Sequence, residues 1–237
     1  MRSTAITLML LFFCSVNTFS QQYSGGNPGI DLNKRNFVDN HFLKKADSVN
    51  LENVSGSPYI SEGFRIGRIV LRNKKTFEDV PVRFNAYNNE MYFSQHGKTY
   101  VIDTALEVSY QEVPGDSTTQ MIFRSGYPAT DNQTTNTYYQ LVAGGNKVHL
   151  IKHIQKKLQE FKVVGSGLPP KKELITTIKW YIYSETDGIH EVKSSRKSIE
   201  KALPSYVKNI EALDAKYDLN LKKDDDMITL VQLLDKM

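Results

Sequence analysis

Apolar and polar residues alternate along most of the chain between residues 59 and 153. Val80, Val82 and Phe84 alternate with Pro81, Arg83 and Asn85. This period of two is typical of a strand with one buried side. Turn-forming residues such as Asn88-Asn89 separate successive segments. The pattern predicts short strands joined by tight turns, which is an antiparallel meander.

The alternation is less uniform in the following part of the chain. Residues 151–161 have apolar side chains at helical spacing, yet they continue a segment with strand character, so both interpretations stay open. Residues 163–172 predict a linker or a long loop. Alternation returns around Trp180, and Asp187-Gly188 predicts a two-residue hairpin turn.

The apolar period changes to helical spacing near the C-terminal end. Pro204 suits a first helical turn, Asp224 is typical of an N-cap, and Asp225-Asp226 complement a helix dipole. The apolar residues at this spacing are Leu203, Val207, Ile210, Leu213 and Tyr217, followed by Met227, Leu230, Val231 and Leu234. We therefore expect one α+β domain: a β-rich antiparallel meander over residues 57–195, either a curled or a barrel-like sheet, with C-terminal helices over residues 196–237 packing on it.

The N-terminal segment predicts export. Arg2 is followed by an apolar run that ends near Phe13 and by polar residues, as in a signal peptide. The run is too short to cross a bilayer, which takes roughly 20 apolar residues. We predict cleavage after Ser20, with residues 1–20 as the signal and residues 21–56 as a flexible segment. Lipidation of Cys14 is an alternative, although Phe13 is larger than the residue that this chemistry prefers.

Composition limits the classes of function. Cys14 is the only cysteine, so cleavage after Ser20 would leave no disulfide and no thiolate site. The net charge of +4 is too small to indicate a dedicated nucleic-acid binder. No later apolar run is long enough to cross a membrane, and the expected setting is the periplasm, the outer membrane or the secreted fraction.

Two segments carry a family resemblance. Ser57-Pro58-Tyr59-Ile60 and the run from Glu78 to Met91 (EDVPVRFNAYNNEM) resemble a pattern in small exported proteins of Bacteroidota, which also have a lysine-rich helical C-terminal part. The resemblance implies export, a β-rich fold and a cell-envelope setting. It carries no catalytic motif and implies no cofactor.

Three short motifs have simpler explanations than chemistry. His149 and His153 would lie roughly 13 Å apart on a strand, which is too far for one metal ion. The acidic run at residues 224–226 is explained by helix capping. Gly115-Asp116-Ser117 resembles the start of a lipase-type block, but it lies between two predicted strands and not at a strand-to-helix turn. We predict no catalytic, cofactor-binding or metal-binding residue.

Aromatic residues provide one candidate surface. Tyr181 and Tyr183 lie on the strand face opposite to Trp180, and an exposed aromatic row can bind sugars, peptides or proteins. The alternative is that both faces are covered, one of them by the C-terminal helices. The expected partner is an envelope protein or a glycan.

The leading hypothesis is therefore an exported, non-catalytic protein that binds or scaffolds something. One alternative is a carrier of an apolar ligand, with a cavity lined by Phe84, Phe93, Phe123 and Trp180. The other is a hydrolase whose site is assembled from distant residues.

Overall fold

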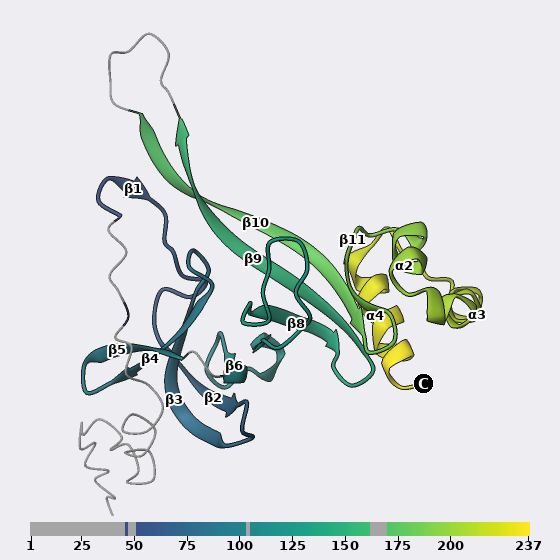
Figure 1. Cartoon of the computed structure of the whole chain (residues 1–237), viewed down its shortest axis with the longest axis horizontal. Coiled ribbons are helices and arrows are strands. Elements are labelled where there is room, and N and C mark those ends of the chain that lie inside the picture. Colours follow the sequence, from purple (N-terminus) through teal and green to yellow (C-terminus); the bar gives the residue numbers. More distant parts are fainter. Residues whose placement is uncertain (1–45, 47–50, 103–104, 162–169) are drawn as a thin grey trace, which may run out of the picture.

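Residue 46 and residues 51–102, 105–161 and 170–237 are described by the computed structural model (Figure 1). The predicted signal peptide, Cys14 and most of the segment 21–56 lie outside these residues. Within them the chain forms an 11-stranded sheet followed by three α-helices. The strands are β1 (Val54–Ser55), β2 (Arg65–Leu71), β3 (Thr76–Asn85), β4 (Glu90–Gln95), β5 (Lys98–Ile102), β6 (Ala105–Gln111), β7 (Gln120–Arg124), β8 (Tyr139–Gly144), β9 (Val148–Phe161), β10 (Lys171–Ser184) and β11 (Gly188–Val192). The helices are α2 (Arg196–Ala202), α3 (Val207–Tyr217) and α4 (Asp224–Asp235).

Strand pairing confirms the β-rich antiparallel prediction. The strand order is β1-β10-β9-β8-β7-β6-β2-β3-β4-β5, with β11 added to β10. Every pair is antiparallel except β1 with β10. The order does not close on itself, so the barrel-like alternative is not formed. The short strand β1 lies at the end of the segment for which we expected only flexibility.

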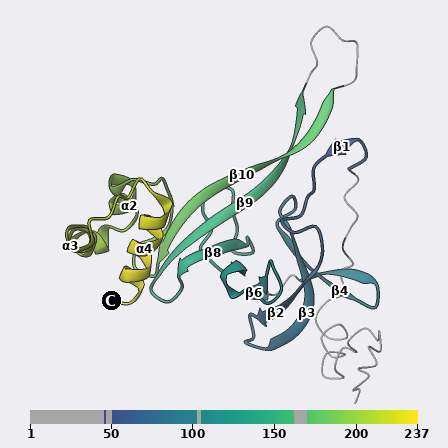
Figure 2. The same cartoon turned by 180° about the vertical axis from the view of Figure 1, so that it is seen from behind.

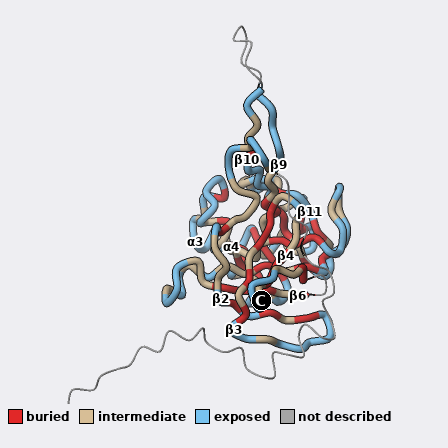
Figure 3. The backbone as a smooth tube through the Cα atoms, turned by 90° about the vertical axis from the view of Figure 1, so that its left-hand side faces the viewer, coloured by how far each residue is buried: buried red, intermediate tan, exposed pale blue. Residues whose placement is uncertain are grey.

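The longest hairpin consists of β9 and β10. Their register runs from Val148 opposite Ser184 to Phe161 opposite Lys171. The segment 151–161 is therefore a strand, and β10 begins within the predicted linker. Pairing with β10 along its whole length, and with β8 at its start, holds β9 in the strand conformation despite its helical spacing of apolar residues. One end of this hairpin extends beyond the rest of the sheet and is exposed (Figures 1 and 3).

The first core lies within the half of the sheet formed by β2 to β7. Val82, Phe84 and Phe93 are almost completely buried there, and the rings of Phe84 and Phe123 are 4.6 Å apart. Gly67 permits close strand packing, because a Cβ atom at this position would lie 2.5 Å from the carbonyl oxygen of Ser109. Phe84, Phe93 and Phe123 all belong to this buried cluster.

The second core lies between the sheet and the helices, as predicted (Figure 2). Leu150 of β9 and Ile182 of β10 pack there against the apolar face of α4. The buried side chains of α4 include Met227, Leu230, Val231 and Leu234. A further helix, α2, precedes Pro204, where we expected a first helical turn. The Ser195 side chain caps this helix.

The start of α4 also differs slightly from its prediction. Lys223 occupies the N-cap position, and Asp224 is the first residue of the helix. All three acidic residues therefore lie in the first turn, where they complement the positive end of the helix dipole.

A third, aromatic core lies on the opposite face of the β9–β10 hairpin. Its buried members are Tyr127, Tyr139, Ile151, Tyr181 and Ile189. Strand β9 contributes to all three cores within a few residues, with Leu150 in the second, Ile151 in the third and Ile154 in the first.

Candidate functional site

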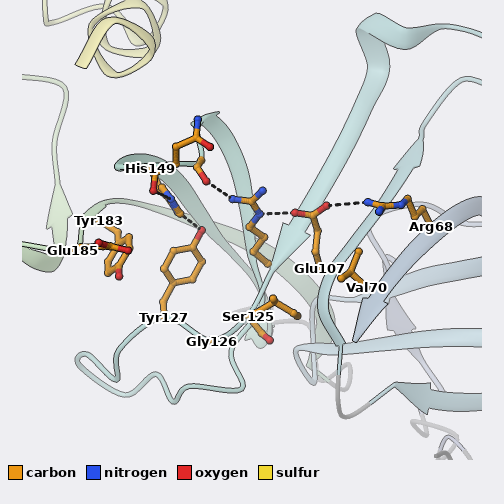
Figure 4. Close-up of a pocket in the computed structure, with 13 residues that line it drawn as sticks. Arg68, Val70, Glu107, Ser125, Gly126, Tyr127, His149, Tyr183 and Glu185 are labelled. Carbon is orange, nitrogen blue, oxygen red and sulfur yellow. Dashed lines mark hydrogen bonds and ion pairs between the residues drawn. The ribbon is translucent and has the colours of Figure 1, made fainter. Parts of the chain in front are cut away.

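A surface pocket of about 480 Å³ lies where the two halves of the sheet meet (Figure 4). Strands β2, β6 and β7 form one wall. The turn between β8 and β9, the start of β9 and the end of β10 form the other. The pocket thus brings together residues that are more than 100 positions apart in the sequence, such as Arg68 and Tyr183.

Arg124 bridges the two walls. Its Nε atom donates to a carboxylate oxygen of Glu107 at 2.5 Å, and its Nη1 atom donates to the carbonyl oxygen of Gly145 at 2.9 Å. Arg68 also approaches Glu107, at 3.9 Å. These contacts hold the Arg124 guanidinium in one orientation. The formal charges of the lining residues also balance, because two arginines, Arg68 and Arg124, lie together with two glutamates, Glu107 and Glu185.

His149 and Tyr127 form a buried hydrogen-bonded pair in the pocket wall. The Tyr127 hydroxyl and His149 Nδ1 are 2.9 Å apart, and His149 Nε2 lies 3.4 Å from the carbonyl oxygen of Asn146. Burial lowers the pKa of His149, although the Asn146 carbonyl acts in the opposite direction, and burial raises the pKa of Tyr127. Both groups are therefore neutral near pH 7. The consistent tautomer carries its proton on Nε2, so that Nδ1 accepts from the Tyr127 hydroxyl.

The two tyrosines predicted from the sequence have different positions. Tyr183 lines the pocket, and its ring lies 5.2 Å from that of Tyr127 and 5.2 Å from that of His149. Tyr181 is fully buried, so the expectation of an exposed row is wrong for this residue. It is covered because its ring packs 5.5 Å from that of Tyr139, and its hydroxyl donates to Asp131 of an adjacent loop.

The two histidines do not form a metal site within the described residues. His149 and His153 share one face of β9, as predicted for a strand, but each packs against a different tyrosine. His153 lies against Tyr139, and burial together with Lys179 and Lys157 lowers its pKa. Its surroundings are those of a core residue.

The lipase-like motif forms a turn capped by Asp116. Asp116 caps the 3₁₀ turn Ser117–Thr119 by accepting from the backbone N–H of Thr118 at 2.9 Å. The motif lies between β6 and β7, as expected from the sequence. It therefore makes a turn and lies outside the pocket.

The pocket lining provides aromatic surfaces and hydrogen-bond donors, whereas its candidate nucleophile and base are already hydrogen-bonded. Ser125 lines it, but its hydroxyl donates to the carbonyl oxygen of Ala105 at 2.7 Å. His149 Nδ1 faces Tyr127, and Glu107 is engaged with two arginines. This arrangement suits binding of a small polar molecule, because it combines aromatic rings with a guanidinium that is held in one orientation.

Sequence reasoning missed Arg124, Glu107 and Tyr127. The one local signal was the turn sequence Arg124-Ser125-Gly126-Tyr127, in which Gly126 has a φ of 91°. Such a turn after a strand can direct two functional side chains to the same side of the sheet. Its partners from β6 and β9 depend on strand pairing, which the sequence pattern did not specify.

Comparison with known proteins gives no match: no family model, curated protein or solved structure is similar to this chain. The resemblance to small exported proteins of Bacteroidota therefore stays a prediction. None of the helices described is long and apolar enough to cross a membrane.

Proposed function

We propose that the protein is an exported, non-catalytic binding protein whose pocket takes a small neutral polyhydroxylated ligand, such as a saccharide unit. The observation that carries the proposal is Arg124, which is fixed between Glu107 and Gly145 and lies close to the Tyr127 hydroxyl in a pocket that Tyr183 also lines. Export is supported by the signal-like segment at residues 1–20.

The charges of the pocket favour a neutral ligand. Two arginines and two glutamates line it, and Glu107 is in contact with both arginines. An anionic ligand would have to compete with the Glu107 carboxylate, and a cationic ligand would be repelled by the guanidinium groups. Hydroxyl groups can both donate to Glu107 and Glu185 and accept from the arginines without adding charge.

The aromatic wall favours a ligand with an apolar face. Tyr127, Tyr183 and His149 are in mutual contact, so the rings are held in place before a ligand binds. Sugar rings combine apolar C–H faces with hydroxyl edges and so match a wall of this kind beside a polar one. A preorganised site also lowers the entropic cost of binding.

The test is purification of the protein from the exported fraction, with mass spectrometry of bound small molecules, followed by calorimetry with neutral and acidic saccharides. We expect Tyr183→Ala to weaken binding of a neutral saccharide by about fivefold, since loss of one aromatic contact is worth roughly 1 kcal/mol. Tyr217→Ala is the matched control, because Tyr217 is exposed on α3, away from the pocket. Equal binding by the Tyr183 variant and the wild type, or binding of acidic saccharides alone, would contradict the proposal.

A further inference from the structure

His149 lies in the aromatic part of the pocket lining and is almost enclosed there (Figure 4). Only 8% of its surface is exposed, and its ring contacts those of Tyr127 and Tyr183. Both ring nitrogens have partners, with Nδ1 2.9 Å from the Tyr127 hydroxyl and Nε2 3.4 Å from the carbonyl oxygen of Asn146. A change in the protonation of His149 therefore acts directly on the pocket lining.

The hydrogen bond between His149 and Tyr127 depends on the protons that the imidazole carries. In the neutral tautomer with its proton on Nε2, the Nδ1 atom accepts from the Tyr127 hydroxyl. When Nδ1 takes up a proton from water, it becomes a donor, and the Tyr127 oxygen has to accept. The hydroxyl proton of Tyr127 then turns away from His149. This hydroxyl lies close to Arg124, so the change occurs beside the guanidinium that the pocket holds in one orientation.

Charged groups on three other parts of the fold act on the His149 imidazole. Arg124 of β7 disfavours its protonation, whereas Asp235 of α4 and Glu185, which follows β10, favour it. Burial of the ring has the largest effect and holds the pKa of His149 below its ordinary value of 6.5. His149 is therefore neutral near pH 7 and takes up a proton only in acid.

Protonation of His149 changes the charge balance of the pocket. At neutral pH the two arginines of the lining are matched by its two glutamates, Glu107 and Glu185. The imidazolium adds a third cation to Arg68 and Arg124, so that cations outnumber carboxylates. A saccharide that carries a carboxylate is then attracted to the pocket, whereas a neutral saccharide gains little from the extra charge.

We propose that His149 determines which saccharides the pocket binds: neutral ones at neutral pH, and also carboxylate-bearing ones, such as uronic acids, when His149 is protonated. This inference rests on the proposed saccharide-binding function and adds a second class of ligand to it. Ordinary carboxyl groups have a pKa near about 4, so the carboxylate of such a ligand stays ionised at about pH 5. The ligand's charge is therefore constant over the range in which His149 takes up its proton.

The test is calorimetry of the exported chain with saccharide pairs that differ in one carboxylate, methyl glucoside with methyl glucuronide and their galactose counterparts. Between about pH 7.5 and about pH 5, we expect the acidic member to gain roughly tenfold in affinity relative to its neutral partner. His149→Gln should remove this gain, because glutamine takes up no proton. His153→Gln is the matched control and should keep the gain, because His153 is also buried on β9 but does not line the pocket.

A second variant tests the charge balance without acid. Glu185→Gln removes one carboxylate from the lining, so the acidic saccharide should gain affinity already at about pH 7.5, where His149 is neutral. The proposal would be overturned by the absence of a gain in this variant, by the absence of a gain in the wild type below about pH 6.5, or by an equal gain in the His149 variant. Failure of every neutral saccharide to bind at about pH 7.5 would instead refute the proposed function itself.

Discussion

The Oδ1 atom of Asp235, at the end of α4, accepts a hydrogen bond of 3.0 Å from the backbone N–H of Val148, at the start of β9. The same oxygen accepts from the backbone N–H groups of Lys147 at 2.7 Å and Asn146 at 3.0 Å. Burial alone would raise the pKa of Asp235, but these backbone donors outweigh it and lower the pKa. One carboxylate thus fastens the last helix to the β8–β9 turn.

Replacement of Asp235 by alanine should be strongly destabilising. It leaves three backbone N–H groups without their charged acceptor, and we expect the free energy of unfolding to fall by about 3 kcal/mol in urea denaturation. Asp225→Ala is a suitable control, because Asp225 lies in the exposed first turn of the same helix and should cost less than about 1 kcal/mol. Similar losses for the two variants would show that the contact with the turn contributes little.

Gly144, the last residue of β8, has no room for a side chain. Its φ is 74°, and a Cβ atom there would lie 1.9 Å from the carbonyl oxygen of Val148. Gly97 has a similar φ of 72° but open space around the corresponding position. We expect Gly97→Ala to cost about 1 kcal/mol of stability from backbone strain alone.

Gly144→Ala adds a backbone clash to that strain, so it should cost at least about 3 kcal/mol or prevent folding. Thermal unfolding followed by circular dichroism would compare the two variants. The explanation would be wrong if both lost the same stability.

Acid should destabilise the protein before its buried carboxylates are protonated. Burial lowers the pKa of His149 and of His153 below the ordinary value of 6.5. As the pH falls through 6.5, the unfolded chain therefore takes up protons that the folded chain does not, and the free energy of unfolding decreases. Urea denaturation between about pH 7 and pH 5 should show this decline.

Histidine variants test the origin of that decline. His153→Gln should reduce the slope of stability against pH, because it removes a buried imidazole whose pKa is lowered by burial. The carboxylates of Asp235 and Glu112 act at lower pH, because hydrogen bonds lower their pKa below 3.8 and 4.5 respectively, despite the opposing effect of burial. An unaltered slope in the His153 variant would assign the decline to other groups.

Loss of the Tyr127 hydroxyl should lower the stability of the protein, because this group is part of the buried pocket wall. Tyr127→Phe leaves the buried Nδ1 of His149 without its donor, and we expect a loss of about 1–3 kcal/mol in stability. Tyr100→Phe is the comparison and should be nearly neutral, because Tyr100 is partly buried and its hydroxyl bonds to none of the described residues. A thermal shift assay distinguishes the two outcomes.

Local patterns predicted the strands well, because alternation directly reports one buried and one exposed face. Val82 and Phe84 were expected on the buried side of a strand, and both are buried in β3. A hairpin turn does contain Asn88-Asn89, between Asn85 and Glu90. The second hairpin, at Asp187-Gly188, lies where it was expected, but its turn consists of residues 185–187, because Gly188 already pairs with Ser184. For residues 151–161 the pattern was ambiguous, because pairing with distant strands determined the conformation.

The same sequence patterns could not predict the pocket. Whether Tyr181 is exposed depends on a loop containing Asp131 that covers it, and alternation cannot show which face of a strand a distant loop covers. Arg124 and Glu107 come from neighbouring strands, and their contact with the β8–β9 turn depends on how the sheet bends. Only the complete strand order brings these residues together.

Strand β9 belongs to all three cores, and this affects how the protein unfolds. Leu150, Ile151 and Ile154 each belong to a different core, so no break in the chain near them leaves one core intact. The molecule cannot be divided into halves that fold alone, and a protease that cuts within β9 should release no stable fragment. Unfolding should then be a single cooperative event, even though the helices and the first five strands lie at opposite ends of the molecule (Figure 1).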